Sequence, residues 1–165
     1  MKILVLSDSH SSLQFMFSCL EQIVPDVVIH LGDYFDDGAA LREAFPGIRL
    51  YQVPGNCDRY RCPPGQPEIL VERILGVNLY LTHGHCHNVK LTLTRLLQDA
   101  RSCRADAVLY GHTHQPDCRQ EPDGMWILNP GSCGYGGRTA GLIEVENGKI
   151  VSCRILRQED LEERP

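Results

Sequence analysis

Five short apolar segments of this chain each run into a residue that can bind a metal ion. The segments span residues 2–6, 27–31, 48–53, 77–81 and 107–110. The first lacks clean alternation of apolar and polar residues, as expected of a strand buried on both faces. Open α/β sheets bind ligands at the carboxyl ends of their strands, so the pattern predicts one shared site. The residues that follow the segments are Asp8-Ser9-His10, Gly32-Asp33, Gly55-Asn56-Cys57-Asp58, Thr82-His83-Gly84-His85 and Gly111-His112-Thr113-His114.

The order of the predicted elements indicates an α/β (α+β) fold. Residues 13–24 have helical periodicity, and Pro25 ends this helix. The helix connects strands 2–6 and 27–31 in a βαβ unit, and a helix over 39–45 followed by strand 48–53 repeats the same plan. Later strands at 68–75 and 77–81 turn at Gly76, and strands at 141–146 and 149–156 flank Asn147-Gly148. Asn88 is the expected cap of a helix over 89–103. This order favours a four-layer αββα sandwich of two mixed sheets flanked by helices.

Size and charge limit the class of protein. A chain of 165 residues fits a single domain, 1–165, whose charged tail, 158–165, we expect to fray. The formal net charge of −5 and the lack of a Lys/Arg cluster argue against binding of long nucleic acid. No apolar run is long enough to span a bilayer, and the start does not resemble a signal peptide, so we expect a cytoplasmic protein without a membrane partner. The eight cysteines form no Cys-x-x-Cys pair and are expected to be reduced.

The residues at the strand ends suggest a two-metal site. Three or four ligands suffice for one metal, whereas a larger set fits two metals that share a carboxylate. Imidazole and carboxylate ligands suit zinc, manganese, iron or nickel. Two divalent ions roughly 3.5–4 Å apart can hold a bridging water, lower its pKa and bind phosphate oxygens, which is what phosphate ester hydrolysis requires. The candidate ligands are Asp8, His10, Asp33, Asn56, His83, His112 and His114.

In this order, the five motifs resemble those of the calcineurin-like metallophosphoesterases. A sixth motif, Asn129-Pro130-Gly131-Ser132, is similar to one in the small YfcE-type phosphodiesterase branch of that family. The resemblance implies an αββα sandwich and a di-metal phosphoesterase that uses a metal-bridging water or hydroxide. It also implies two divalent ions, with Mn²⁺ expected first and Ni²⁺, Zn²⁺, Fe²⁺ or Mg²⁺ as alternatives. By that resemblance Asp8, His10 and His114 bind the first ion, Asp33 bridges, and Asn56, His83 and His112 bind the second.

Cys57 departs from the wider family, whose larger phosphatases have at this position a histidine thought to protonate the leaving group. A thiol is a poor proton donor at neutral pH, so leaving groups must be good, or His85 or water supplies the proton. Asp58 is either a carboxylate that orients a neighbouring histidine or a surface residue. Arg59 is a candidate substrate contact, together with His85, against the alternative of a solvated loop arginine. The candidate catalytic residues are therefore Asp33, Asn56, His85, Asp58 and Cys57.

Two other functions remain open beside a phosphodiesterase acting on a small-molecule phosphoester. One is a phosphomonoesterase acting on a small metabolite, which differs only in its substrate pocket. The other is a non-catalytic scaffold, because a retromer subunit with the same fold resembles this chain and is regarded as a binding surface. The intact ligand set favours the enzyme. The family also suggests a homodimer or higher homo-oligomer, although no stretch identifies the interface.

Overall fold

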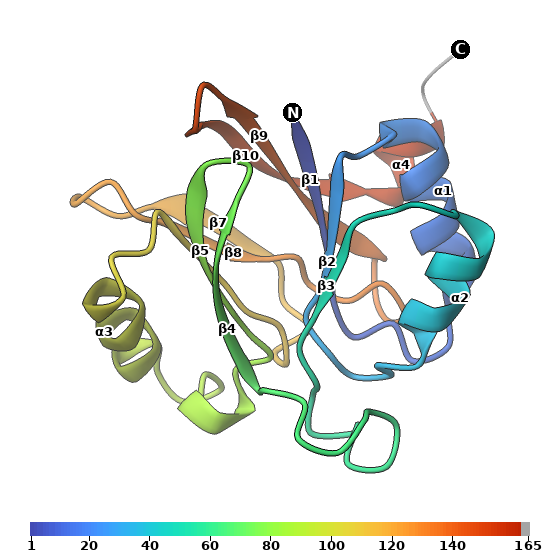
Figure 1. The fold of residues 1–165 in the computed structure, drawn as a ribbon, viewed down its shortest axis with the longest axis horizontal. Coiled ribbons are helices and arrows are strands. Elements are labelled where there is room, and N and C mark those ends of the chain that lie inside the picture. The colour runs from blue at the N-terminus through green and yellow to red at the C-terminus, as the bar shows by residue number, and fades with distance from the viewer. Residues whose placement is uncertain (163–165) are drawn as a thin grey trace.

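Two five-stranded β-sheets face each other, with helices on both outer surfaces (Figure 1). The computed structural model describes residues 1–162. The first sheet has the order β10 (Lys149–Arg157), β9 (Thr139–Glu146), β1 (Lys2–Leu6), β2 (Val27–His30) and β3 (Leu50–Gln52). The second has the order β4 (Ile69–Ile74), β5 (Val77–Thr82), β6 (Ala107–Leu109), β8 (Trp126–Asn129) and β7 (Asp117–Gln120). The helices are α1 (Leu13–Ile23), α2 (Asp37–Ala44), α3 (Thr94–Ser102) and α4 (Gln158–Glu162), with a 3₁₀ turn, η1, at His85–His87.

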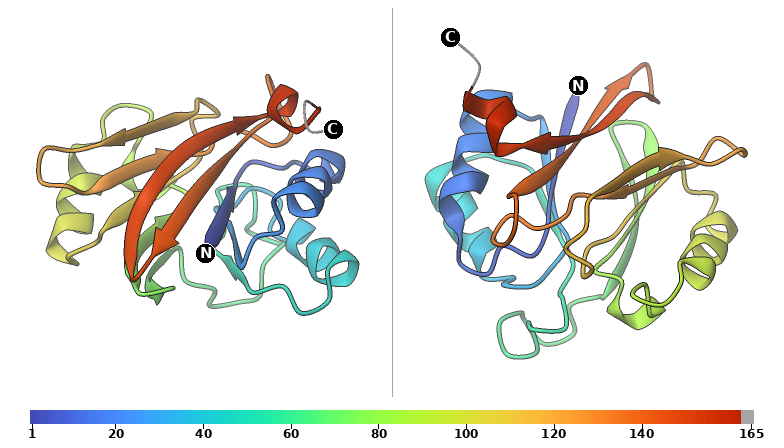
Figure 2. Two further views of the ribbon diagram at one scale, coloured as in Figure 1. Left: turned by 90° about the horizontal axis from the view of Figure 1, so that it is seen from above. Right: turned by 180° about the vertical axis from the view of Figure 1, so that it is seen from behind.

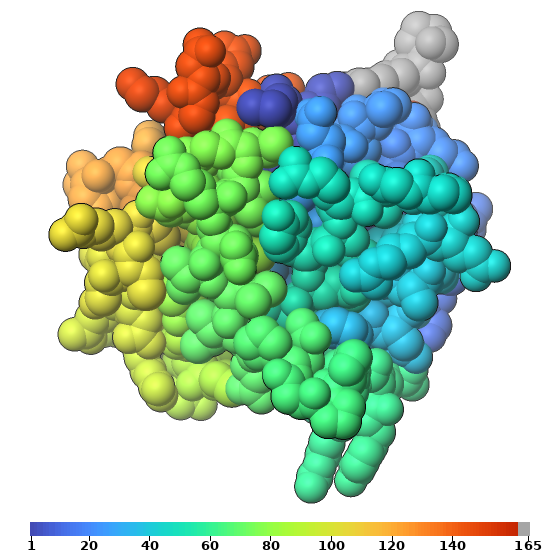
Figure 3. Space-filling view, in the orientation of Figure 1, coloured from blue at the N-terminus to red at the C-terminus, as the bar shows by residue number. Residues whose placement is uncertain are grey.

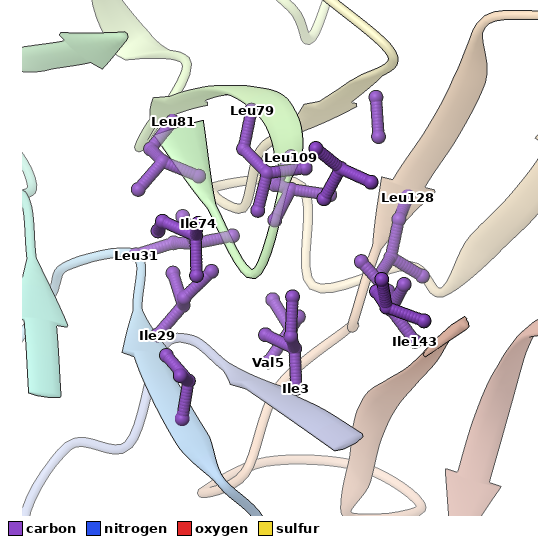
Figure 4. Close-up of a cluster of buried hydrophobic side chains, with 14 of the residues drawn as sticks. Ile3, Val5, Ile29, Leu31, Ile74, Leu79, Leu81, Leu109, Leu128 and Ile143 are labelled. Atoms are coloured by element: carbon purple, nitrogen blue, oxygen red, sulfur yellow. The ribbon is translucent and has the colours of Figure 1, made fainter. Parts of the chain in front are cut away.

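Three apolar layers hold the elements together. Side chains such as Ile3, Ile29, Leu79 and Leu109 fill the space between the two sheets (Figure 4). A second layer, which includes Met16, joins the first sheet to α1, α2 and α4, and a third joins the second sheet to α3. Figure 2 shows α3 on one side of the molecule and the other helices on the opposite side. The predicted four-layer αββα sandwich is confirmed.

Each sheet contains three parallel strands, and these determine where the strand ends lie. β1, β2 and β3 are parallel in the first sheet, and β5, β6 and β8 are parallel in the second. The remaining strands pair in antiparallel fashion at the edges. Asn147 and Gly148 have φ of 50° and 72°, which the tight turn between β9 and β10 requires, and this predicted hairpin is confirmed. The predicted hairpin of β4 and β5 at Gly76 is confirmed as well.

The structure differs from the sequence-based expectations in three places. The expected helix over 89–103 begins only at Thr94, because Asn88 has φ of 53° and ends η1 instead of capping a helix. Strand β7 was not predicted, since its sequence, Asp117 to Gln120, is polar and half-exposed at a sheet edge. Residues 158–162 of the tail form α4 instead of fraying, because Leu161 is buried against the layer that contains α1. Residues 163–165 lie outside the described part of the chain.

Within residues 1–162, none of the helices combines the length and the apolar character needed to cross a bilayer.

The burial of Leu161 gives a test of the packing of α4. Leu161 is only 4% exposed, and Leu161→Ala removes its apolar contacts. We therefore expect the free energy of unfolding to fall by about 2 kcal/mol. Urea unfolding followed by circular dichroism measures this change. Glu159→Ala, on the exposed side of the same helix, is the matched control and should change stability by no more than about 0.5 kcal/mol. Equal midpoints for the two variants would contradict the packing described.

Candidate metal centre

The carboxyl ends of strands from both sheets meet at one end of the sandwich. Asp8 follows β1, Asp33 follows β2, His83 follows β5 and His112 follows β6. The backbone N–H of His112 donates to Asp8 Oδ2 at 3.1 Å, which joins the end of β6 directly to the end of β1 in the other sheet. Side chains distant in the sequence therefore share one small volume.

A first group of four side chains has the composition of a metal site. The ligand atoms of Asp8, His10, Asp33 and His114 all lie within 4.8 Å of one another. His114 Nε2 is 3.0 Å from Asp8 Oδ1, and His10 Nε2 is 3.9 Å from Asp33 Oδ2. Tyr135 stacks on the His114 ring with 5.7 Å between the centroids. Two carboxylates and two imidazoles thus surround one point.

A second group surrounds His83, which is fully buried. His83 Nδ1 is 2.8 Å from the carbonyl oxygen of Leu31, which can only accept, so Nδ1 carries the proton. The lone pair on Nε2 then faces two other oxygens, Asn56 Oδ1 at 3.1 Å and Asp33 Oδ1 at 3.6 Å. The His112 ring lies beside it, with 5.0 Å between the centroids. Three groups direct their lone pairs at one point, and a cation bound at that point would stabilise this arrangement.

Asp33 lies between the two groups and offers one carboxylate oxygen to each. Oδ2 faces His10, and Oδ1 faces His83. Oδ1 also accepts a hydrogen bond from the backbone N–H of Cys57 at 2.9 Å, which fixes the carboxylate. Gly55 permits this approach, because a Cβ at that position would collide with Asp33 Oδ1. This is the position expected of a bridging carboxylate.

Buried polar atoms without a hydrogen bond support the presence of a cation in the first group. Asp8 Oδ1 and His10 Nε2 are buried and make no hydrogen bond with the described residues, and their nearest charged partners are the other candidate ligands His114 and Asp33. A buried polar atom without a partner costs about 1–3 kcal/mol, so such atoms need an explanation. Carboxylate and imidazole atoms are ligands for divalent transition metals, and the donor set fits that requirement.

The electrostatics of the site keep most of its candidate ligands in the protonation states that metal binding needs, whereas burial raises the pKa of Asp8 to about 6. Burial lowers the pKa of His10 and His112, and it lowers the pKa of His83 to about 3. Burial acts to raise the pKa of Asp33, but the nearby His83 and the Cys57 N–H outweigh it and leave the pKa below its ordinary value. These imidazoles are neutral and the Asp33 carboxylate is ionised at neutral pH, so little proton release accompanies cation binding there.

The backbone at the site is strained in a way that is rare for residues other than glycine. Asp8, His10, Asp33, His112 and His114 all have positive φ, between 45° and 69°. Such conformations cost roughly 1–3 kcal/mol each and persist where surrounding structure holds them. Five of the seven candidate ligands share this conformation, and such strain tends to cluster at functional sites.

Asp58 has a different role from the one predicted. It is fully buried, and its hydrogen bonds go to backbone N–H groups instead of a histidine ring. Oδ1 accepts from Tyr34 and Phe35 at 2.7 and 2.9 Å, and Oδ2 accepts from Gly55 at 2.7 Å. Asp58 therefore ties the loop after β2 to the loop after β3, and these loops carry Asp33 and Asn56.

The remaining predicted site residues surround an open cavity of about 440 Å³ next to the ligands. Asn56, Arg59 and His85 line it. The loop that follows β3 forms its outer wall and projects from the surface (Figure 3). Cys57 is exposed, and burial together with the Asp33 carboxylate raises the pKa of its thiol, so the thiol stays protonated at neutral pH. The cavity gives a phosphoester room beside the candidate metal ligands.

Sequence reasoning did not assign several residues that support the ligands. Ser7 Oγ donates to Asp8 Oδ2 at 2.6 Å, and Ser132 Oγ donates to the Asp8 carbonyl at 2.8 Å. Asn129 Nδ2 donates to the Gly111 carbonyl at 3.1 Å, before the two histidines. The motif at 129–132 was a signal for the last two, but nothing local in the sequence marks Ser7 or Tyr135.

Two further histidines are buried. His30 lies in β2 and is fully buried, with its Nε2 3.0 Å from Ser9 Oγ. His87, at the end of η1, is buried as well. It is 2% exposed, and its Nε2 is 3.1 Å from the Tyr80 hydroxyl and 3.3 Å from Asp99 Oδ2. Its position after a turn of mixed polarity gave no sign of this burial.

Comparison with known proteins agrees with the geometry. Residues 1–148 match the calcineurin-like phosphoesterase superfamily domain. Phosphodiesterase YfcE of Escherichia coli is 30% identical over 156 residues, which cover 80% of this chain and 79% of YfcE.

Solved structures share the fold. A crystal structure of a predicted phosphoesterase from Streptococcus pneumoniae has a TM-score of 0.76 and 26% identity, and the match covers 96% of this chain and 90% of that one. Vps29 from Entamoeba histolytica, in complex with Zn²⁺, has a TM-score of 0.70 at 20% identity, with coverage of 95% and 99%. At that identity, the likeness to Vps29 shows the fold alone. The match over residues 1–148 and the identity to YfcE establish that this chain belongs to the calcineurin-like phosphoesterase superfamily.

Proposed function

We propose that the protein is a phosphodiesterase that hydrolyses small phosphodiesters with the help of two divalent cations. The observation that carries the proposal is the position of Asp33, with one carboxylate oxygen facing His10 and the other facing His83. A site for one cation does not require a carboxylate that is shared between two groups of ligands. The relationship to proteins named phosphoesterases and phosphodiesterases supports the same reaction class.

The ligands divide between the two cations. Asp8, His10 and His114 would hold one, Asn56, His83 and His112 would hold the other, and Asp33 would contact both. When bound, the two cations polarise phosphate oxygens and make a water molecule acidic enough to act as a nucleophile near neutral pH. The set contains oxygen and imidazole ligands without a thiolate, which suits Mn²⁺ first and also admits Fe²⁺, Ni²⁺, Zn²⁺ or Mg²⁺.

The cavity beside the ligands favours a diester over a monoester. A diester carries a second organic group, and the cavity of about 440 Å³ offers space for it beside Asn56. Arg59 at its edge places a positive charge where a phosphodiester is negative. His85 lines the same space and is the side chain placed to give a proton to the departing alcohol.

A non-catalytic scaffold is the competing function, and the likeness in fold to Vps29 favours it. The two functions make opposite predictions for turnover, so an assay separates them.

Hydrolysis should require added metal and intact Asp33. We expect metal-stripped protein to be inactive towards bis(p-nitrophenyl) phosphate and to recover activity with Mn²⁺, because the chain's own ligands cannot polarise the phosphate. Asp33→Asn, which removes the shared charge, should lower turnover by about 10³-fold. Release of p-nitrophenol measures both effects.

The matched control is Asp123→Asn, which changes an exposed carboxylate in the turn between β7 and β8 that pairs with Arg101. It should retain full activity. Metal binding without turnover of this diester or of p-nitrophenyl phosphate would contradict the proposed enzymatic function and support the scaffold function.

Cys57 should limit the enzyme to good leaving groups. Because the thiol does not give up its proton near neutral pH, we expect high turnover of aryl phosphodiesters and little turnover of alkyl monoesters. Cys57→His supplies a better proton donor at this position and should raise turnover of alkyl esters by about tenfold, with a smaller effect on aryl esters. Comparison of kcat for the two ester classes tests this. A preference of the natural protein for alkyl monoesters would contradict it.

Asp58 should act by positioning the two loops. Asp58→Ala leaves three N–H groups, one of them buried and two partly buried, without their acceptor, so we expect a loss of about 3 kcal/mol in the free energy of unfolding and a lower kcat. Asp58→Asn keeps one acceptor oxygen and should recover part of both. Asp36→Ala, a neighbouring exposed carboxylate paired with Arg61, should cost less than about 1 kcal/mol. Full stability in Asp58→Ala, measured by urea unfolding, would rule out this role.

A further inference from the structure

A second cluster of metal-binding side chains lies beside the cavity, apart from the seven ligands described above. Glu68, His85 and Cys86 place their ligand atoms within 4.8 Å of one another. Cys86 Sγ donates to Glu68 Oε2 at 2.6 Å, and His85 Nε2 is 3.9 Å from Glu68 Oε1. A carboxylate, an imidazole and a thiol therefore face one another at the protein surface.

The fold fixes these three residues independently of the first site. β4 pairs with β5 so that Ile69 lies opposite Thr82, and this register brings Glu68 to the start of η1. η1 is held from the other side by its last residue, His87, which is buried and contacts Tyr80. Strand register and a buried anchor thus position the cluster.

The chemistry of the cluster differs from that of the candidate metal centre. The seven ligands there are carboxylate, amide and imidazole groups, whereas this cluster includes a thiol. Thiolate together with imidazole and carboxylate selects Zn²⁺ and similar ions over Mg²⁺ or Mn²⁺. We propose that Glu68, His85 and Cys86 form a third metal site that takes Zn²⁺ or Co²⁺ and leaves one coordination position to water.

Occupation of this site would change what His85 can do. The proposed function uses His85 as a proton donor in the cavity, and this consequence rests on that function. A metal ion on Nε2 blocks that atom from carrying a proton, so Zn²⁺ at this site inhibits the Mn²⁺-loaded enzyme. Gly84, with φ of 105°, separates His83 from His85 and lets the two rings face different partners.

Cobalt provides a readout that does not need activity. We expect metal-free protein titrated with Co²⁺ to show a thiolate-to-cobalt charge-transfer absorption, because only the proposed site contains a thiolate ligand. Cys86→Ala should lose this absorption and bind one ion fewer per chain, and Glu68→Gln should weaken the absorbing site by about tenfold. Cys57→Ala is the matched control, since the Cys57 thiol contacts Asp33 in the candidate metal centre, and this variant should keep the absorption. Absence of the band in the natural protein, or its survival in Cys86→Ala, would overturn the site.

Inhibition is measured separately. With the enzyme loaded with Mn²⁺, the Zn²⁺ concentration that halves diester turnover should rise at least tenfold in Cys86→Ala. If the cobalt band behaves as expected but no metal gives turnover, the site stands and the proposed function fails. If turnover is present and Zn²⁺ inhibits both proteins equally, the inhibitory role of the site is wrong.

Discussion

The apolar layer between the two sheets determines where every candidate ligand lies. Apolar side chains from β1 and β2 meet apolar side chains from β5 and β6 across this layer (Figure 4). Because these strands run to the same end, the layer brings Asp8 and Asp33 from one sheet beside His83 and His112 from the other. A shift of either sheet along the strands would separate Asp8 from the His112 N–H that now contacts it at 3.1 Å. The chemistry of the site therefore depends on an interface that contains none of its ligands.

The site is also built at a local energetic cost that hydrogen bonds around it offset. Asp8 adopts φ of 53°, yet its N–H donates to the Gly32 carbonyl at 2.9 Å, and its own carbonyl accepts from Ser132 Oγ. Gly111 allows Ser7 to reach the Asp8 carboxylate, since a Cβ there would collide with Ser7 Oγ. Ligands held this way before a cation arrives lose little conformational freedom on binding.

The sequence was informative wherever a local pattern had one structural solution. Apolar runs with no clean alternation had to be buried strands, and Asn147-Gly148 had to be a tight turn. The same logic placed the seven candidate ligands, because each lies within five residues after the end of a strand. Together these features predicted the sandwich and the centre of the site.

What could not be predicted depends on contacts between distant residues. Asp58 follows Asn56 closely enough to look like part of the catalytic group, but its partners are N–H groups of the preceding loop. Strand β7 exists because β8 offers it an edge, and its own residues carry no apolar pattern. Tyr135 reaches His114 only through a turn between β8 and β9. None of these contacts leaves a periodic or compositional trace in the chain.

The distribution of thiols suggests how one small surface can separate two kinds of metal ion. Cys57 follows Asn56 directly but is not one of the candidate ligands. It donates its N–H to Asp33 Oδ1, and its thiol also hydrogen-bonds to the Asp33 carboxylate. The sulfur of Cys86 lies against Glu68, which also faces His85. In the proposed arrangement His83 and His85, only 5.4 Å apart between centroids, would belong to ligand sets of different softness. Ions that prefer oxygen and ions that prefer sulfur would then meet the same loop at different residues, and occupancy at one would act on the chemistry at the other.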